Sequence, residues 1–146
     1  MPHVLIPMDG STSALQAVEF VIQHRAMFEP LQVSLLNVQP GLLPEFARLL
    51  IGGATVDDYH IARGEVAFHS ACVRLNLAHI PYGQEINIGH VAESIVEYAA
   101  DHRCDHIVMG SRGLGSTGQW LLGSSTTQVL HLAEVPVTVV KAQRHH

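Results

Sequence analysis

The chain is almost without lysine. Of its 146 residues only Lys141 is a lysine, the basic residues number 8 against 13 acidic ones, and the formal net charge is −5. A protein that binds a nucleic-acid backbone needs clustered Lys and Arg side chains to displace the counterions of the phosphates. The sequence therefore predicts no nucleic-acid partner.

Cysteines and long apolar runs are also scarce. The two cysteines, Cys72 and Cys104, form no CxxC pair, so we expect no disulfide in a reducing compartment and predict that both are small, buried thiols. No segment reads as a secretory signal, and none is apolar over the length that crosses a bilayer. These absences predict a cytoplasmic protein with no membrane partner.

Hydrophobic residues are abundant, at 47% of the chain, whereas charged residues make up 14%. This balance favours a well-buried sheet covered by helices over a disordered chain. A length of 146 residues suits one hydrophobic core. We therefore expect a single domain over residues 1–146.

Short β-rich runs alternate with helical patterns along the chain. The predicted strands are 3–8, 31–38, 84–89, 105–110 and 135–141, and the predicted helices are 11–28, 56–78, 90–102 and 124–133. In the first helix, Ser13 and Gln16 have the spacing of a capping box. Such alternation with right-handed crossovers predicts an α/β fold in which helices cover both faces of a five-stranded parallel sheet.

Ligands of open parallel sheets bind beyond the carboxyl ends of the strands. Two segments follow such ends: "PMDGS", which carries Pro7 and Asp9 after the first strand, and "MGSRGLGSTGQWLLGSST", residues 109–126, after the fourth. If these strands are neighbours, Asp9 faces the glycine-rich segment.

Glycine in such a segment lets backbone N–H groups approach an anion closely. Gly123, Ser124 and Ser125 open the last predicted helix, whose unpaired N–H groups and positive dipole end would receive a phosphate, while Gly110 and Gly113 would accommodate a ribose or an inner phosphate. The alternative is an ordinary loop in which Ser124 or Ser125 caps the helix.

Three familiar phosphate motifs do not fit these residues. A Walker loop needs a lysine beside its Ser or Thr, but the chain has none before position 141. Gly113, Gly115 and Gly118 spell GxGxxG, but too little chain follows them for a dinucleotide-binding βαβ unit. A receiver domain needs an acidic pair after the first strand, and only Asp9 is there.

The spacing Gly110-x2-Gly113-x9-Gly123-Ser124, with Asp9 after the first strand, resembles the ATP-binding branch of the universal stress proteins. The resemblance covers essentially the whole chain. It implies a Rossmann-like fold of the adenine nucleotide alpha hydrolase type, with strand order 3-2-1-4-5. It also implies ATP as the ligand, with Pro7 and Asp9 bordering the adenosine and the backbone of Val38 offered to adenine.

The remaining site residues follow from the same resemblance. Gly110, Gly113, Gly123, Ser124 and Ser125 would hold the ribose and phosphates, and Arg112 would supply positive charge. Asp9 is a candidate Mg²⁺ ligand or ribose partner, with capping of the first helix as its structural alternative. Phosphoryl transfer needs a metal, a positioned nucleophile and charge stabilisers, so we expect an ATP-occupied sensor or regulator with slow hydrolysis at most.

The resemblance further implies a homodimer whose last strands pair across a two-fold axis, and the β-branched "VPVTVV" suits that role. The alternative function is a nucleotide-free dimeric scaffold of the same fold that acts through protein contacts. Two weaker signals remain. The cluster His102, Cys104, Asp105 and His106 runs from a helix into a strand, which disfavours a metal site. The apolar stretch 42–51 would be a lid or a partner surface, or it would cover the open end of the sheet.

Overall fold

Five parallel strands form the centre of the molecule. A computed structural model describes residues 3–29, 31–41, 55–112 and 122–141. The strands are β1 (His3–Pro7), β2 (Gln32–Gln39), β3 (Tyr82–Ile88), β4 (His106–Gly110) and β5 (Val137–Val140). They lie in the order β3-β2-β1-β4-β5, and every neighbouring pair is parallel, which confirms the predicted sheet and its order.

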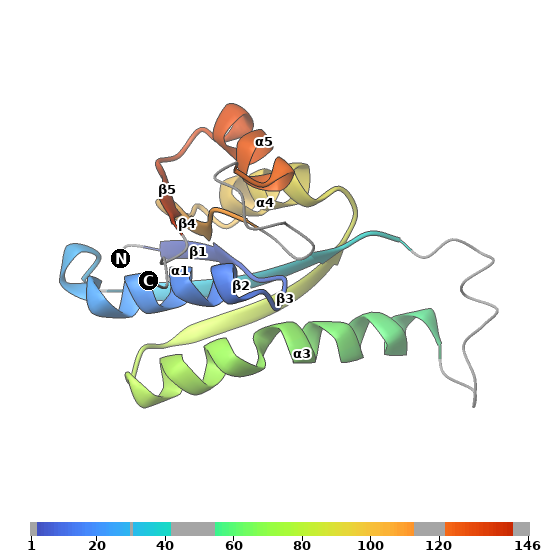
Figure 1. Ribbon diagram of the computed structural model, residues 1–146, viewed down its shortest axis with the longest axis horizontal. Coiled ribbons are helices and arrows are strands. Elements are labelled where there is room, and N and C mark those ends of the chain that lie inside the picture. The colour runs from blue at the N-terminus through green and yellow to red at the C-terminus, as the bar shows by residue number, and fades with distance from the viewer. Residues whose placement is uncertain (1–2, 30, 42–54, 113–121, 142–146) are drawn as a thin grey trace, which may run out of the picture.

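Helices cover both faces of this sheet (Figure 1). The helices are α1 (Thr12–Gln23), α3 (Val56–Leu77), α4 (Val91–Asp101) and α5 (Ser124–Leu132), with a short 3₁₀ helix, η1, over Arg25–Met27. In Figure 1, α4 and α5 lie above the sheet, whereas α1 and the long α3 lie below it. Helix α1 is thus shorter than the predicted helix 11–28, because it ends at Gln23.

The central strands form the core because they are apolar on both sides, as buried parallel strands are. Val4 and Ile6 of β1 pack into one cluster with residues of α1 and α3. Leu5, between them, packs into a second cluster with residues of α4 and α5. One strand therefore holds both helical layers, and its carboxyl end is fixed between them.

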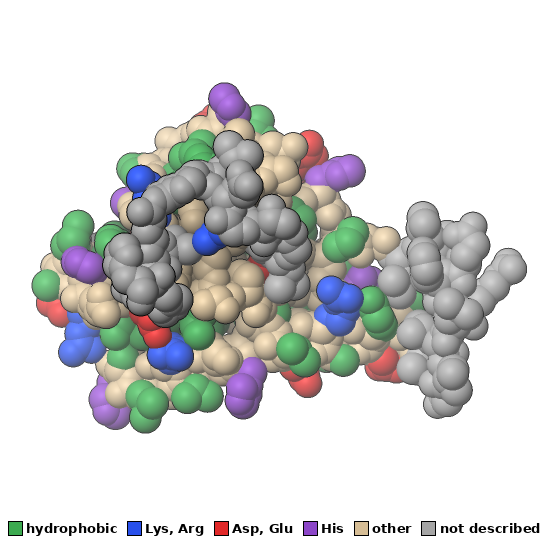
Figure 2. Space-filling model, viewed as in Figure 1, with side chains coloured by type: hydrophobic (Ala, Val, Ile, Leu, Met, Phe, Trp, Pro, Cys, Tyr) green, Lys and Arg blue, Asp and Glu red, His purple; other side chains and the backbone are tan. Residues whose placement is uncertain are grey.

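The outer elements are more exposed. β3 is an edge strand with mostly exposed or half-buried side chains, and β5 forms the opposite edge. The outer face of α3 carries exposed apolar residues, among them Val66 and Leu77, both 77% exposed. Figure 2 shows hydrophobic, charged and histidine side chains interspersed along the lower edge, where α3 runs.

The predicted capping box of α1 is wrong. Ser11 is the N-cap, and its hydroxyl accepts a hydrogen bond from the N–H of Ala14 at 3.1 Å. Ser13 lies inside the helix, is buried, and accepts a hydrogen bond from the N–H of Arg112 at 3.2 Å. The sequence did not distinguish the N-cap, because Ser11 and Ser13 are both good capping residues. In the folded protein Ser13 is used in the contact between α1 and the end of β4, and Ser11 is the cap.

None of the helices in the described ranges is long and apolar enough to cross a membrane. The apolar stretch 42–51 lies outside the described residues.

Candidate functional site

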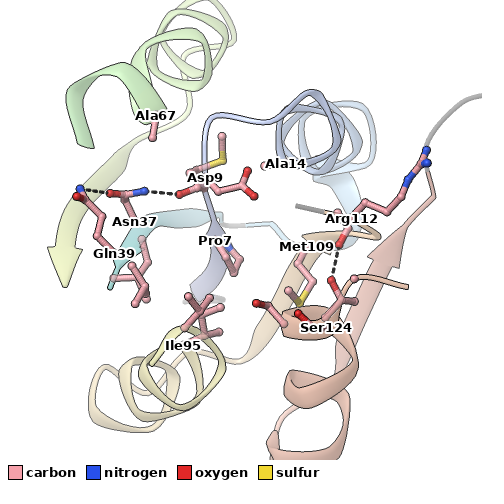
Figure 3. A pocket seen from close by; sticks show the side chains of 18 of the residues that line it. Pro7, Asp9, Ala14, Asn37, Gln39, Ala67, Ile95, Met109, Arg112 and Ser124 are labelled. Atoms are coloured by element: carbon pink, nitrogen blue, oxygen red, sulfur yellow. Dashed lines mark hydrogen bonds between the residues drawn. The ribbon is translucent and has the colours of Figure 1, made fainter. Parts of the chain in front are cut away.

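A cavity of about 400 Å³ opens at the carboxyl edge of the sheet, where β1, β2 and β4 end (Figure 3). We call it the carboxyl-edge cavity. Its volume lies in the range of small-molecule and cofactor sites. Of the nine predicted site residues, eight line it: Pro7, Asp9, Val38, Gly110, Arg112, Gly123, Ser124 and Ser125. The ninth, Gly113, lies outside the described residues.

Asp9 enters the cavity from the loop after β1. Its Oδ1 accepts a hydrogen bond from the N–H of Ser11 at 2.9 Å, and Gly10 between them has a φ of +84°, which favours glycine. Helix α1 is therefore capped by Ser11 and not by Asp9. Among the described residues that line the cavity, Asp9 is the one acidic side chain.

Val38 presents backbone groups to the cavity. In a parallel strand, alternate residues direct their N–H and C=O toward opposite neighbours. The carbonyl of Leu36 accepts a hydrogen bond from Met8 on the β1 side, whereas the carbonyl of Gln39 accepts one from Gly89 on the β3 side. Val38 therefore faces the β1 side, beyond the end of β1. Within the described ranges, no backbone hydrogen bond from the β1 loop reaches its N–H or C=O.

Gly110 has a structural reason to lack a side chain. A Cβ at this position would lie 2.5 Å from the carbonyl oxygen of Ser13 and 2.6 Å from its carbonyl carbon. Gly110 thus lets α1 pack directly on the end of β4. It also lines the cavity, and its contact with a ribose or phosphate stays a prediction.

The N-terminus of α5 opens into the same cavity. Gly123 is the N-cap, no side chain from the described residues caps the helix, and the first turn holds no acidic residue. The N–H of Gly123 donates to the carbonyl of Ser111 at 2.7 Å, and the hydroxyl of Thr126 donates to the carbonyl of Gly110 at 3.0 Å. These bonds join α5 to the end of β4. Capping by Ser124 or Ser125 is wrong, because both residues lie within the first turn.

Two of the described arginines line the cavity. The guanidinium of Arg112 points away from Pro7 and Asp9 in Figure 3, so its predicted role in supplying charge would require a different side-chain orientation. Arg63 of α3 was missed by the sequence analysis. It donates to the hydroxyl of Tyr59 at 2.9 Å and lies over that ring, with its Cζ 5.6 Å from the centroid.

A buried polar chain at the end of β2 was also missed. Asn37 and Gln39 line the cavity and are 5% and 4% exposed. The Nδ2 of Asn37 donates to the carbonyl of Met8 at 2.8 Å, and the Nε2 of Gln39 donates to the Oδ1 of Asn37 at 2.7 Å. A signal was present, since these two amides interrupt the otherwise apolar "LLNVQP".

The histidine and cysteine cluster lies at the opposite edge of the sheet. His102 stacks on Tyr98 with ring centroids 3.8 Å apart, and the Nε2 of His106 lies 2.6 Å from the hydroxyl of Thr138. The Sγ of Cys104 lies 3.7 Å from the Nδ1 of His3. The part of the chain that is described contains no group of three or more such residues placed to hold a metal ion.

Comparison of the sequence with known proteins identifies one family. The model of the Universal stress protein family matches residues 1–141. Universal stress protein MJ0531 of Methanocaldococcus jannaschii is 30% identical over an alignment of 142 residues, which covers 94% of this chain and 81% of that protein. A universal stress protein of Thermus aquaticus is 43% identical over 53 residues, a match that spans 36% of this chain and 39% of that protein.

Solved structures have the same fold. The hypothetical protein MJ0577 superposes with a TM-score of 0.79 at 26% identity, over 98% of this chain and 97% of that one. A universal stress protein family protein from Arabidopsis thaliana, with AMP bound, gives 0.70 at 20% identity, over 98% and 93% of the two chains. The universal stress protein from Archaeoglobus fulgidus in complex with dAMP gives 0.68 at 19% identity, over 97% and 98%.

Proposed function

The chain belongs to the universal stress protein family, and from this premise we propose that its carboxyl-edge cavity binds an adenine nucleotide, ATP in the form we favour. The proposal rests on two features that lie on opposite sides of the cavity. The unpaired backbone edge of Val38 lies on one side, and the uncapped N-terminus of α5 lies on the other.

The Val38 side suits a base. Its N–H is a donor and its C=O an acceptor, and adenine offers an acceptor, N1, beside a donor, the 6-amino group. Both backbone groups point beyond the end of β1, so a base can extend the hydrogen-bond ladder that β1 no longer provides.

The α5 side suits phosphates. The first-turn N–H groups of a helix lack intrahelical partners and lie at the positive end of its dipole. The hydroxyls of Ser124 and Ser125 add donors at the same place. Gly123 keeps the helix start free of a side chain, and its φ of −61° shows that the turn itself does not require glycine. We infer that Gly123 serves close approach by a phosphate.

The ribose and a metal ion would lie between these two sides. Asp9 projects into that space in Figure 3, and its carboxylate is the cavity's acidic group among the described lining residues. It would hold a ribose hydroxyl, or Mg²⁺ carried in with the triphosphate, since that ion prefers carboxylate oxygens and phosphates. Mg²⁺ would neutralise phosphate charge when bound.

The structural relatives support the choice of ligand. The Arabidopsis protein is described with AMP and the Archaeoglobus protein with dAMP, and both have this fold over nearly the whole chain. A monophosphate would occupy the base and ribose parts of the cavity. ATP is favoured here because the α5 N-terminus offers further donors for the outer phosphates.

The protein would act as a sensor or regulator with slow hydrolysis at most. The described lining residues bind and orient a nucleotide, and they include one carboxylate and no histidine that could activate water. Bound ATP would stabilise the cavity's walls, which belong to both helical layers, and thereby report nucleotide level to a partner. A cytoplasmic location stays a prediction from the sequence.

A homodimer through β5 belongs to the same proposal. β5 is an edge strand of four residues, its side chains are all half-buried, and three of the four are valine. Such an edge is prone to pair with another strand unless it is covered. Light scattering of the wild-type protein and of Val139→Lys tests this: we expect a dimer and a monomer, and a wild-type monomer would contradict it.

One experiment tests the proposed nucleotide function directly. The purified protein is denatured, any released nucleotide is identified by chromatography, and the emptied, refolded protein is titrated with ATP and Mg²⁺. We expect released adenine nucleotide or saturable ATP binding. A protein that is empty and shows no binding up to millimolar ATP overturns the proposal and leaves the nucleotide-free scaffold.

A further inference from the structure

We propose that Asn37 determines the base preference of the carboxyl-edge cavity, because its side chain takes the place of the next backbone hydrogen bond between β1 and β2 and so leaves the N–H of Val38 for the ligand. This inference rests on the proposed nucleotide function and identifies a positioning residue for it.

The first step is the hydrogen-bond ladder itself. The N–H of Met8 donates to the carbonyl of Leu36 at 2.8 Å, so the β1–β2 ladder continues one residue past Pro7. In a parallel pair, the next bond would run from the N–H of Val38 to the carbonyl of Met8. No such bond exists between these two described residues. The carbonyl of Met8 instead accepts the Nδ2 of Asn37 at 2.8 Å.

The second step is the orientation of the Asn37 amide. Its Oδ1 accepts the Nε2 of Gln39 at 2.7 Å, which leaves Nδ2 directed at Met8. Gln39 is oriented in turn by His60, because its Nε2 also donates to the carbonyl of His60 at 2.8 Å and its Oε1 lies 2.6 Å from the Nδ1 of that ring. Each amide has one favourable orientation within this buried chain.

A bound base would meet the N–H and C=O groups of Val38. Because Asn37 satisfies the Met8 carbonyl, the Val38 N–H stays available as a donor beside the Val38 carbonyl, an acceptor. Adenine complements this pair with N1 and its 6-amino group. Hypoxanthine and guanine have the reverse arrangement, an acceptor at O6 and a donor at N1, so two donors and two acceptors would face each other.

The fourth step is the change that removes the device. In Asn37→Leu the side chain keeps nearly the same size but has no donor, so the Met8 carbonyl can accept the Val38 N–H and complete the ladder. ATP then loses one hydrogen bond, whereas inosine triphosphate never had it. We expect the dissociation constant of ATP to rise about tenfold and that of inosine triphosphate to change less than about twofold.

The matched control is Ser34→Ala. Ser34 lies on the same strand, is 6% exposed, and forms a partly buried hydrogen bond with His3 near the amino end of the sheet. It does not line the cavity. This variant should lose stability but keep the wild-type ratio of the two dissociation constants. Equal weakening of both nucleotides in Asn37→Leu would indicate a merely structural role and overturn the inference.

A second measurement needs no variant. In the wild-type protein, the Val38 amide should exchange with solvent quickly when the cavity is empty, should become protected on addition of ATP, and should stay unprotected with inosine triphosphate. A Val38 amide that is already protected without nucleotide overturns the inference, even if Asn37→Leu fails to fold.

The outcomes also separate this inference from the proposed function. If the wild-type protein binds neither nucleotide, the proposed function fails. If it binds ATP and inosine triphosphate equally well, nucleotide binding stands and the role of Asn37 is wrong.

Discussion

The backbone of Ser13 occupies the space where Gly110 would carry a side chain. A Cβ on Gly110 would lie 2.5 Å from the Ser13 carbonyl oxygen, and the Ser13 hydroxyl accepts the N–H of Arg112 two residues further along. Helix α1 is thus fastened to the end of β4 at two adjacent points. This contact positions one wall of the carboxyl-edge cavity without any contribution from a ligand.

Gly110→Ala should therefore destabilise the fold. The added methyl group meets backbone atoms that cannot move aside without shifting α1, so we expect a loss of about 1–3 kcal/mol in urea unfolding. Gly83→Ala is the control, because a Cβ on Gly83 meets no atom within 4 Å. Its change should stay within about 0.5 kcal/mol. Equal effects of the two substitutions would contradict the packing argument.

Ser124→Asp should affect stability and binding in opposite directions. A carboxylate in the first turn of α5 complements the helix dipole and should raise the unfolding free energy by about 0.5 kcal/mol. The same charge repels phosphates, so ATP affinity should fall at least about tenfold. Ser124→Asn, which is neutral, should change both quantities less. Calorimetry gives the affinity, and unchanged ATP affinity in Ser124→Asp would argue against phosphates at this helix end.

Substitutions of Asp9 can separate the effect of its hydrogen bond from the effect of its charge. Asp9→Asn keeps an oxygen that can accept the Ser11 N–H, which Oδ1 of Asp9 accepts at 2.9 Å. Its stability should change by less than about 1 kcal/mol, while Mg²⁺ should strengthen ATP binding less than in wild type. Asp9→Ala should lose the loop contact as well. If ATP affinity and its Mg²⁺ dependence are unchanged in Asp9→Ala, the ribose and metal roles of Asp9 are wrong.

Burial of His106 should make the free energy of unfolding depend on pH. Desolvation lowers the pKa of His106 below its ordinary value of 6.5, so the unfolded chain binds this proton more readily than the folded protein. The free energy of unfolding should therefore decrease as the pH falls below about 6.5 toward the lowered pKa of the folded state. Urea midpoints of wild type and His106→Asn, measured from about pH 8 to about pH 5, isolate this residue from the other histidines. A slope that is the same in both proteins would contradict the prediction.

The two thiols should differ in reactivity. Burial, with a smaller effect of Asp105, raises the pKa of Cys104 to about 11, so about one thiol in ten thousand is ionised at neutral pH. Cys72 is half-buried, and Cys104 is buried. A thiol-directed reagent should label Cys72 in the native protein and both residues in urea, as mass spectrometry can show. Rapid labelling of native Cys104 would contradict this assignment.

Much of the lining of the candidate site was accessible from sequence because parallel α/β sheets bind their ligands beyond the carboxyl ends of the strands. Asp9 follows one strand, and Gly110 ends another, so the strand order alone brings them to one cavity. Arg63 was not accessible in this way. It lies in the first half of the 22-residue helix α3, and a helical pattern does not indicate which turn passes beside the end of a distant strand.

Packing also changed the physical reasons for the residue types at two predicted positions. Gly110 is at the cavity as predicted, but its missing side chain faces Ser13 and not the cavity alone. Ser124 is likewise at the helix start as predicted, but Gly123 is the N-cap. The contact between Gly110 and Ser13 joins segments that are about a hundred residues apart, which local sequence patterns do not relate. The choice of Gly123 as N-cap depends on how α5 meets the end of β4.

The sequence by itself determined the alternation of strands and helices, the parallel sheet and the edge at which a ligand site is expected, because hydrophobic periodicity and crossover handedness are local constraints. Tertiary structure alone decided which backbone groups stay unpaired at that edge. The Val38 N–H is available because the Asn37 side chain, oriented by Gln39 and His60, occupies the Met8 carbonyl. That arrangement joins β1, β2 and α3, and it exists only once the three are packed together.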